Sequence, residues 1–400
     1  MGETVEVPTQ TAPINPSVLQ WAIDEAGESI TGLAERLKVP TERVESWVSG
    51  DARPSVPQLR RIAKILKRPS ALFYLAEPPA RAALPTRLRH APGGRDLTPT
   101  EIGEIRWARR LQEAASWLID HNPDEQPEPL PAAQMEVSPE AAAAVVRDFV
   151  GVSVEEQLAW PDPGTAYREW RRALTERGVL VFQFELGRGG LRGFSTFDTR
   201  APMLAVNSAY RPEVRIYSMM HELGHLVLGE ESACVSFVNP RMPNAPAVER
   251  WCERFAAAFL LPAEAFKSMA AALGLGLDTD ERDAFSLISR IARRFKVSLR
   301  AAAIRAEETG VRPRLFGVVE QLAGPTLDLP PEPTKKAGGG VPAAEKRVRF
   351  FGRRVPDLFI SGVDQGLITQ REAGGYLHLA PAGFTDLEHM IRSGSDKVAR

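Results

Sequence analysis

The chain has 400 residues, of which 44% are hydrophobic and 25% charged, and its formal net charge is −1 at pH 7. These values are typical of a globular protein of two or three domains, and the near-zero charge excludes an overall basic field for nucleic acid. Two cysteines exclude a disulfide framework, and without a signal-peptide pattern or a run of eighteen apolar residues we expect a cytoplasmic protein with no membrane segment.

After a disordered N-terminus at 1–15, residues 16–78 are expected to form a small all-helical domain. Apolar residues recur at helical spacing in four segments, 16–26, 29–37, 41–47 and 55–66. A short turn at 38–40 separates the second segment from the third, and Thr41 is a suitable N-cap for the third. Two helices joined in this way are the parts of a helix-turn-helix, whose second helix can enter the DNA major groove.

The segment LAERLKVPTERVESWVSGDARPSVPQLRRIAKIL resembles the XRE/Cro-type helix-turn-helix. Ala34 is the small residue at the helix crossing, and Trp47 closes the second helix. The resemblance implies DNA binding, for which the expected contact residues are Thr41, Arg43, Ser46 and Arg53. Glu42 and Glu45 oppose the charge of Arg43, and phosphate binding needs net positive charge, so a helical fold used for protein contact is the alternative.

Residues 79–161 are expected to be a linker followed by a helical connector. The first part is rich in Pro, Gly and Arg, which predicts an extended segment. Helical spacing returns over 96–121 and 138–150, with a Pro-rich loop between them.

A different pattern begins at Asp162 and predicts an α+β domain over residues 162–312. A capped helix runs to Arg177, and three short strands follow at 179–185, 193–198 and 203–207. Two apolar helices, 214–229 and 249–261, come next. This order of elements is the outline of a small zincin-like core with a three-stranded sheet.

The first of the two apolar helices carries the sequence His221-Glu222-x-x-His225. Positions four apart lie on one face of a helix, so both imidazoles can occupy corners of a zinc tetrahedron. Glu222 can then reach a water at the metal without being a ligand, and act as its general base. The flanking residues are apolar, and a charged Glu buried between two histidines needs a compensating partner.

Glu249 is the expected third ligand, because a carboxylate that opens an apolar helix is costly unless it is paired or bound to a metal. It would complete a His₂Glu site whose fourth position is left to water. Glu253 lies one turn further along and could point the same way. Cys252 and Cys234 could also supply a ligand, although a small buried cysteine is the commoner outcome.

The segments PMLAVNSAYRPEVRIYSMMHELGHLVLG and VERWCERFAAAFLLP resemble the ImmA/IrrE family of metallopeptidases, over about residues 166–312. The residues at the family's positions are Asn207, Arg215, His221, Glu222, His225 and Glu249. Glu253 stands where the family usually has asparagine, which leaves open whether Glu249 alone completes the site.

The resemblance implies a zinc endopeptidase joined to a DNA-binding domain that cleaves a repressor or antitoxin partner and so controls gene expression. In the alternative, the chain is a transcriptional regulator whose zincin fold senses a ligand or partner with little proteolysis. A third reading is an antitoxin-like structural partner, and a homodimer also remains open.

Residues 313–345 are predicted to be a flexible linker because they contain the segments PTLDLPPEP and KKAGGG. Residues 346–400 are predicted to be a helical extension, similar to that of some long members of the family. The segment LISRIARRFKVSLRAAAIRAEETG, just before the linker, also has a helix-turn-helix pattern. The whole chain is therefore expected to be a multidomain, mostly α protein.

Overall fold

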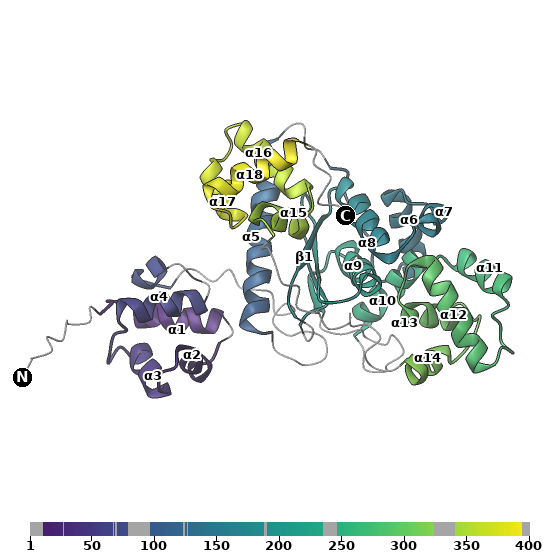
Figure 1. Ribbon diagram of the computed structural model, residues 1–400, viewed down its shortest axis with the longest axis horizontal. Coiled ribbons are helices and arrows are strands. Elements are labelled where there is room, and N and C mark those ends of the chain that lie inside the picture. The colour runs from purple at the N-terminus through teal and green to yellow at the C-terminus, as the bar shows by residue number, and fades with distance from the viewer. Residues whose placement is uncertain are drawn as a thin grey trace, which may run out of the picture. The chain divides into compact units, whose positions relative to one another are not determined.

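The computed structural model, shown in Figure 1, describes residues 11–26, 28–66, 68, 70–78, 97–122, 125, 127–187, 190–234, 246–323 and 341–393. The described residues fall into two compact units, one that ends at Trp107 and a larger one that begins at Ala108. They are mostly helical, with one small sheet in the larger unit. This agrees with the predicted multidomain, mostly α fold.

The N-terminal unit contains four short α-helices around one apolar core. They are α1 (Pro16–Glu25), α2 (Ile30–Leu37), α3 (Thr41–Ser49) and α4 (Val56–Ile65), followed by a 3-10 helix, η1 (Ser70–Tyr74). The predicted helices are confirmed to within a few residues at each end. Their core includes Leu33, Val44 and Ile62, which have no or almost no exposed surface.

The turn between α2 and α3 depends on one left-handed residue. Lys38 has φ 59°, and the N–H of Val39 returns to the carbonyl of Ala34 at 3.1 Å, which closes the end of α2. Ala34 and Trp47 are both buried in the shared core. The small side chain of Ala34 therefore lies where the two helices approach each other, as the sequence predicted.

The sheet of the larger unit has four strands, one more than predicted. They are β1 (Leu180–Phe184), β2 (Gly193–Thr196), β3 (Met203–Asn207) and β4 (Ser232–Cys234), in the order β1-β3-β2-β4. β1 pairs with β3 in parallel, and the other two pairings are antiparallel. β4 has only three residues, Ser-Ala-Cys, without the β-branched or aromatic side chains that identify a strand.

Three helices position the motif of the larger unit. α8 (Pro163–Glu176) and α10 (Ala247–Leu260) both pack against α9 (Pro212–Val227), and α9 also contacts β2 and β3. Every residue of α9 from Ile216 to Val227 is buried. A helix that is apolar on all sides belongs in a protein core, and α9 lies there.

Several segments expected to be connectors belong to this core. α6 (Pro139–Val150) packs along α10, and α7 (Val154–Ala159) contacts α12. α14 (Leu315–Ala323), inside the expected linker at 313–345, packs on α13 through buried Leu315 and Val319. The remaining helices in this region are α11 (Ala263–Leu273), α12 (Glu281–Phe295) and α13 (Leu299–Glu308). Composition alone did not reveal these contacts, because short alanine-rich or proline-flanked helices resemble linkers.

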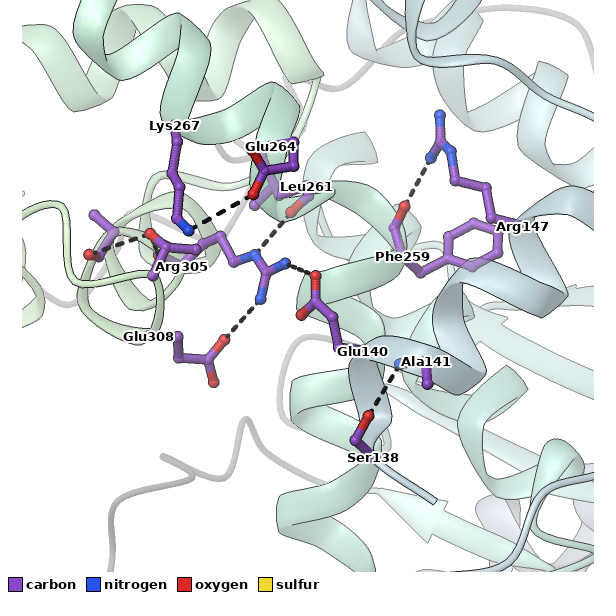
Figure 2. Close-up of polar contacts among 12 residues, drawn as sticks. Ser138, Glu140, Ala141, Arg147, Phe259, Leu261, Glu264, Lys267, Arg305 and Glu308 are labelled. Carbon is purple, nitrogen blue, oxygen red and sulfur yellow. Dashed lines mark hydrogen bonds and ion pairs between the residues drawn. The ribbon is translucent and has the colours of Figure 1, made fainter.

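Side chains from three other helices cap the C-terminal carbonyls of α10. Arg147 of α6 donates to the carbonyl of Phe259 at 2.7 Å, and Arg305 of α13 donates to that of Leu261 at 2.7 Å, as Figure 2 shows. Gln157 of α7 donates to the carbonyl of Leu260 at 3.0 Å. These carbonyls have no partner inside the helix, and the two cations also lie at its negative end. The caps fix one end of the helix that carries Glu249.

The C-terminal helices pack together, and the first of them lies on β1. They are α15 (Ala343–Phe351), α16 (Arg354–Asp364), α17 (Gln370–Tyr376) and α18 (Pro381–Arg392). The Phe351 ring meets that of Phe182 edge-on, with centroids 5.0 Å apart, and Phe350 stacks on Phe184 at 6.4 Å. Arg171 of α8 donates to the carbonyls of both Phe350 and Val181. The expected separate extension is therefore part of the larger unit.

α5 (Pro99–His121) supplies the remaining support for the sheet through its second half. The buried amide of Gln112 donates to the carbonyls of Thr196 and Ala201, at 2.8 and 2.9 Å.

Among the described helices, no single one is long and apolar enough to cross a membrane. The bent pair α10 and α11 has the necessary length and apolar composition when the two helices are taken together.

Candidate metal centre

α9 presents the two histidines of the motif on one face, one turn apart. Their Nε2 atoms lie 3.2 Å apart, and both side chains are buried. Two imidazole nitrogens that converge inside a protein core need a proton or a cation between them, because two lone pairs repel.

Gly224, which lies between the histidines in the motif, lets α10 approach α9 closely. A Cβ at Gly224 would lie 3.3 Å from the Cα of Cys252 and 3.2 Å from the ring of Phe255. This close approach brings the first turn of α10, and with it Glu249, to the histidines.

Glu249 completes a group of three converging ligand atoms. One of its oxygens lies 3.2 Å from Nε2 of His221, and the other lies 3.6 Å from Nε2 of His225. A tetrahedral zinc with ligand distances of about 2.1 Å would separate its ligand atoms by about 3.4 Å. The 3.2 Å between the two Nε2 atoms fits an edge of such a tetrahedron, and each oxygen of Glu249 lies close to one of these nitrogens. Within the described residues, this is the group of His, Cys, Asp and Glu side chains able to hold a metal ion.

Glu253 meets the same histidine from the opposite side. Its oxygen lies 3.7 Å from Nδ1 of His221, whereas Glu249 approaches Nε2. A carboxylate at the second ring nitrogen of a metal-binding histidine orients the ring and increases its basicity. The geometry therefore gives Glu249 and Glu253 different positions, which the spacing in the sequence could not distinguish.

Cys252 does not join the group. Burial raises the pKa of the Cys252 thiol well above its ordinary value, and the nearby carboxylates add to this effect, so Cys252 stays protonated. Its side chain packs against Gly224 instead. Cys234 ends β4, and its side chain lies outside the described part of the chain.

The charges around His221 are those of a site for a cation. Burial lowers the pKa of His221, but the carboxylates of Glu253 and Glu249 outweigh this and raise it to about 9. Burial raises the pKa of Glu249, but hydrogen bonds from the two histidines hold it well below its ordinary value. In the metal-free protein a proton on His221 thus takes the place of a cation's charge.

Glu222 lies beneath β2 and β4 with no exposed surface. One of its oxygens, Oε2, accepts a hydrogen bond from the hydroxyl of Ser232 on β4. A Cβ at Gly193 of β2 would lie 3.0 Å from the other oxygen, Oε1, so the strand runs directly over the carboxylate. Ser232 has no recognisable signal in the sequence, because a serine just beyond a helix stands out only once β4 places it over α9.

The comparison with protein families identifies this region. Residues 174–307 match the family model Peptidase_M78, described as the IrrE N-terminal-like domain. This stretch of the chain is therefore similar to an IrrE-type domain. The match covers all four residues of the predicted centre, namely His221, Glu222, His225 and Glu249. It confirms the predicted resemblance for this part of the chain.

No curated protein matches the chain. Among solved structures, one of PlcR from Bacillus thuringiensis, in complex with the peptide PapR7 and DNA, aligns over 96% of this chain and 98% of that chain. Its sequence identity is 10% and its TM-score is 0.15. At that TM-score the likeness carries no argument about fold or function.

Asn207 and Arg215 of the IrrE-type domain have structural contacts rather than contacts with the ligand atoms. The buried amide of Asn207 donates to the carbonyls of Gly187 and Leu191, which shapes the loop after β1. Arg215 donates to Gln183 of β1 at 2.8 Å and lies over the ring of Tyr167, 4.2 Å from its centroid. These contacts give Arg215 a packing role between α9, β1 and α8.

The residues predicted to contact DNA lie in and just after α3, in the N-terminal unit. Arg43 and Arg53 are exposed, whereas Thr41 and Ser46 are half-buried. Glu42 and Glu45 are exposed on the same helix, so α3 also carries the opposing charge noted in the sequence. Their contact with DNA stays a prediction.

Proposed function

We propose that the IrrE-type domain is a zinc-dependent endopeptidase. The observation that carries the proposal is the convergence of His221, His225 and Glu249, whose ligand atoms all lie within 4.8 Å of one another. Glu222 extends from the same helix and is buried beside this group. Three protein ligands and one open position distinguish catalytic zinc sites from structural ones, which have four protein ligands.

The proposed mechanism divides the work between the metal and the protein. Zinc held by the three ligands would supply Lewis acidity, which polarises a peptide carbonyl and makes a water more acidic. Glu222 would take the proton from that water and later deliver it to the leaving amine. Glu253 would hold the ring of His221, and the low polarity of the surrounding core would strengthen each of these interactions.

The position of the substrate needs one correction. The strand that ends at Asn207 precedes the motif helix and could be expected to pair with an extended substrate, but β3 lies between β1 and β2. Its backbone is therefore already paired on both sides. β4 is an outer strand of the sheet and carries Ser232 beside Glu222, so we propose β4 as the strand to which an extended peptide would add.

The substrate class comes from the resemblance alone: a repressor with a helix-turn-helix, or an antitoxin. The proposal is tested by incubating the purified, zinc-loaded chain with a candidate repressor from its own genome and following cleavage by mass spectrometry. Glu222→Gln is expected to keep stoichiometric zinc and to lose cleavage by at least about a hundredfold. Full cleavage by the zinc-loaded Glu222→Gln variant would disprove the mechanism.

A second candidate function is DNA binding by the N-terminal unit, which makes the chain a transcription regulator. It is favoured by the exposed arginines of α3 and of the loop after it, Arg43 and Arg53. Removal of an arginine that binds a phosphate should reduce the salt dependence of binding by about one unit in slope. We expect Arg43→Ala with Arg53→Ala to weaken binding to the DNA upstream of its gene. An unchanged gel shift would favour the use of this unit for protein contact.

A further inference from the structure

The catalytic carboxylate is held by a buried hydroxyl from a different element. Ser232 on β4 donates to Oε2 of Glu222, and its own oxygen lies 3.3 Å from that of Ser195 on β2. Ser195 and Ser232 are directly opposite each other in the antiparallel pairing of the two strands. All three side chains are buried. An uncompensated hydroxyl is costly in such a place, so both serines depend on these contacts.

Counting protons fixes the direction of this chain of hydrogen bonds. An ionised carboxylate only accepts, and each serine has one proton to donate. Since Ser232 gives its proton to Glu222, the contact between the two serines requires Ser195 to donate to Ser232. The bonds therefore run toward Glu222, and the first one strengthens the second.

The two oxygens of Glu222 are in different situations. Oε2 is held by Ser232, whereas Oε1 has no hydrogen-bond partner among the described residues although it is buried. Gly193 leaves the space beside Oε1, because a Cβ there would lie 3.0 Å from it. A buried carboxylate oxygen without a partner is expected only where something binds it in the working protein.

We propose that Ser232 is a positioning residue, which fixes Oε2 of Glu222 so that Oε1 alone faces the water at the metal centre. This inference rests on the proposed peptidase function. It adds that the general base is aligned by the outer strand β4, and not only by the helix that carries the zinc-binding motif.

Three variants test the proposal in the full-length chain. Ser232→Ala removes the hydroxyl, and Ser232→Thr keeps it on a side chain suited to a strand. Thr196→Val is the matched control, because Thr196 is also a buried hydroxyl of this sheet but donates to Gln112, away from the centre. All three should bind zinc with the stoichiometry of the wild type, since none is a ligand.

The first measurement is the affinity of the zinc-loaded proteins for acetohydroxamate, which binds zinc and needs an adjacent carboxylate to accept a proton. We expect Ser232→Ala to bind it at least about tenfold more weakly, and Ser232→Thr and Thr196→Val to stay within about threefold of the wild type. Wild-type affinity in Ser232→Ala, an equal loss in Thr196→Val, or no recovery in Ser232→Thr would each overturn the proposal. On a cleaved substrate, Ser232→Ala should lower kcat and leave KM nearly unchanged.

The second measurement needs no metal, so it remains informative if the peptidase proposal fails. In the metal-free chain, Ser232→Ala, Glu222→Ala and the double variant form a cycle for the unfolding equilibrium of the larger unit in urea. If Ser232 and Glu222 are directly bonded, the effect of the double variant on the unfolding equilibrium constant should differ about tenfold from the product of the two single effects. Additive effects would show that Ser232 and Glu222 act independently. If the two residues are coupled but the protein cleaves no substrate, the contact between Ser232 and Glu222 is confirmed and only the proposed peptidase activity is refuted.

Discussion

Three buried carboxylates, Glu222, Glu249 and Glu253, surround the same pair of histidines, and each meets a different atom. Glu249 faces Nε2 of both rings, Glu253 faces Nδ1 of His221, and Glu222 is held by Ser232. Position along the helices, and not residue type, separates the three glutamates that we propose as ligand, supporting group and base. The sequence contains the same three glutamates but no information about which nitrogen each one meets.

At the residue scale, the two carboxylates of α10 should differ in their effect on zinc. Glu249→Gln removes a charged ligand, and we expect the purified protein to lose stoichiometric zinc. Glu253→Gln should keep zinc and bind it about 10- to 100-fold more weakly, as is usual when a group behind a histidine ligand is changed. Metal analysis and competition with a chelator measure both. Loss of zinc in Glu253→Gln alone would reverse the assignment.

Removal of the metal provides another test at this scale. Without a cation, the buried carboxylates repel one another and the converging ligand atoms lack a partner, which destabilises the folded state. A metal that binds only the folded state stabilises it by mass action. We expect EDTA to lower the Tm of the larger unit and added Zn²⁺ to restore it. The His221→Ala variant serves as the control, because its Tm should not respond to either treatment.

At the scale of elements, the centre depends on how closely α9 and α10 approach. Gly224→Leu would force a large side chain against Cys252 and Phe255, which already lie near the limit for a Cβ. We expect the free energy of unfolding to fall by about 1–3 kcal/mol from overpacking, and zinc affinity to fall as Glu249 moves away. Urea unfolding and a zinc titration measure the two effects. Unchanged zinc affinity would show that α10 is not positioned by this contact.

The opposite end of α10 is held by polar side chains, and Gln157 is the one that links it to the end of α12. Its amide donates to the carbonyls of Leu260 and Phe295, so it joins the ends of α10 and α12. Gln157→Leu would leave two buried carbonyls without donors, at about 1–3 kcal/mol each. Thermal unfolding should show a clear loss of stability. The control is Gln365→Leu, at an exposed position, which should have little effect.

For the larger unit as a whole, the C-terminal helices contribute to stability, because α15 buries aromatic surface of β1. Phe351 has about 1% of its surface exposed and packs on Phe182. We expect Phe351→Ala to destabilise the unit by about 3–5 kcal/mol, the usual range for a buried phenylalanine. Denaturant unfolding measures this change. No effect would show that the C-terminal helices do not contribute to the stability of the larger unit.

The helix-turn-helix pattern occurs twice in the chain, and the two copies have different surroundings. Lys38 and Lys296 both adopt φ 59° at the turn, so the local sequence forms the same turn in both places. α3 keeps an exposed face with Arg43, but α13 is buried from Ala301 to Ala306 against its neighbours. Only the first copy could present its second helix to DNA. The local sequence pattern determines the turn, whereas tertiary packing determines which face of the second helix stays accessible to solvent.

The sequence by itself determined the helices, the spacing of His221 and His225, and the presence of a carboxylate on the next helix. These features are periodic or local, so they can be read without knowing what packs against them. Tertiary structure decided which glutamate lies at Nε2 of both histidines, where β4 lies, and which of the described strands are outermost in the sheet. It also decided that α6, α14 and the C-terminal helices belong to the larger unit. Those outcomes depend on contacts between residues far apart in the chain, and no local pattern encodes such contacts.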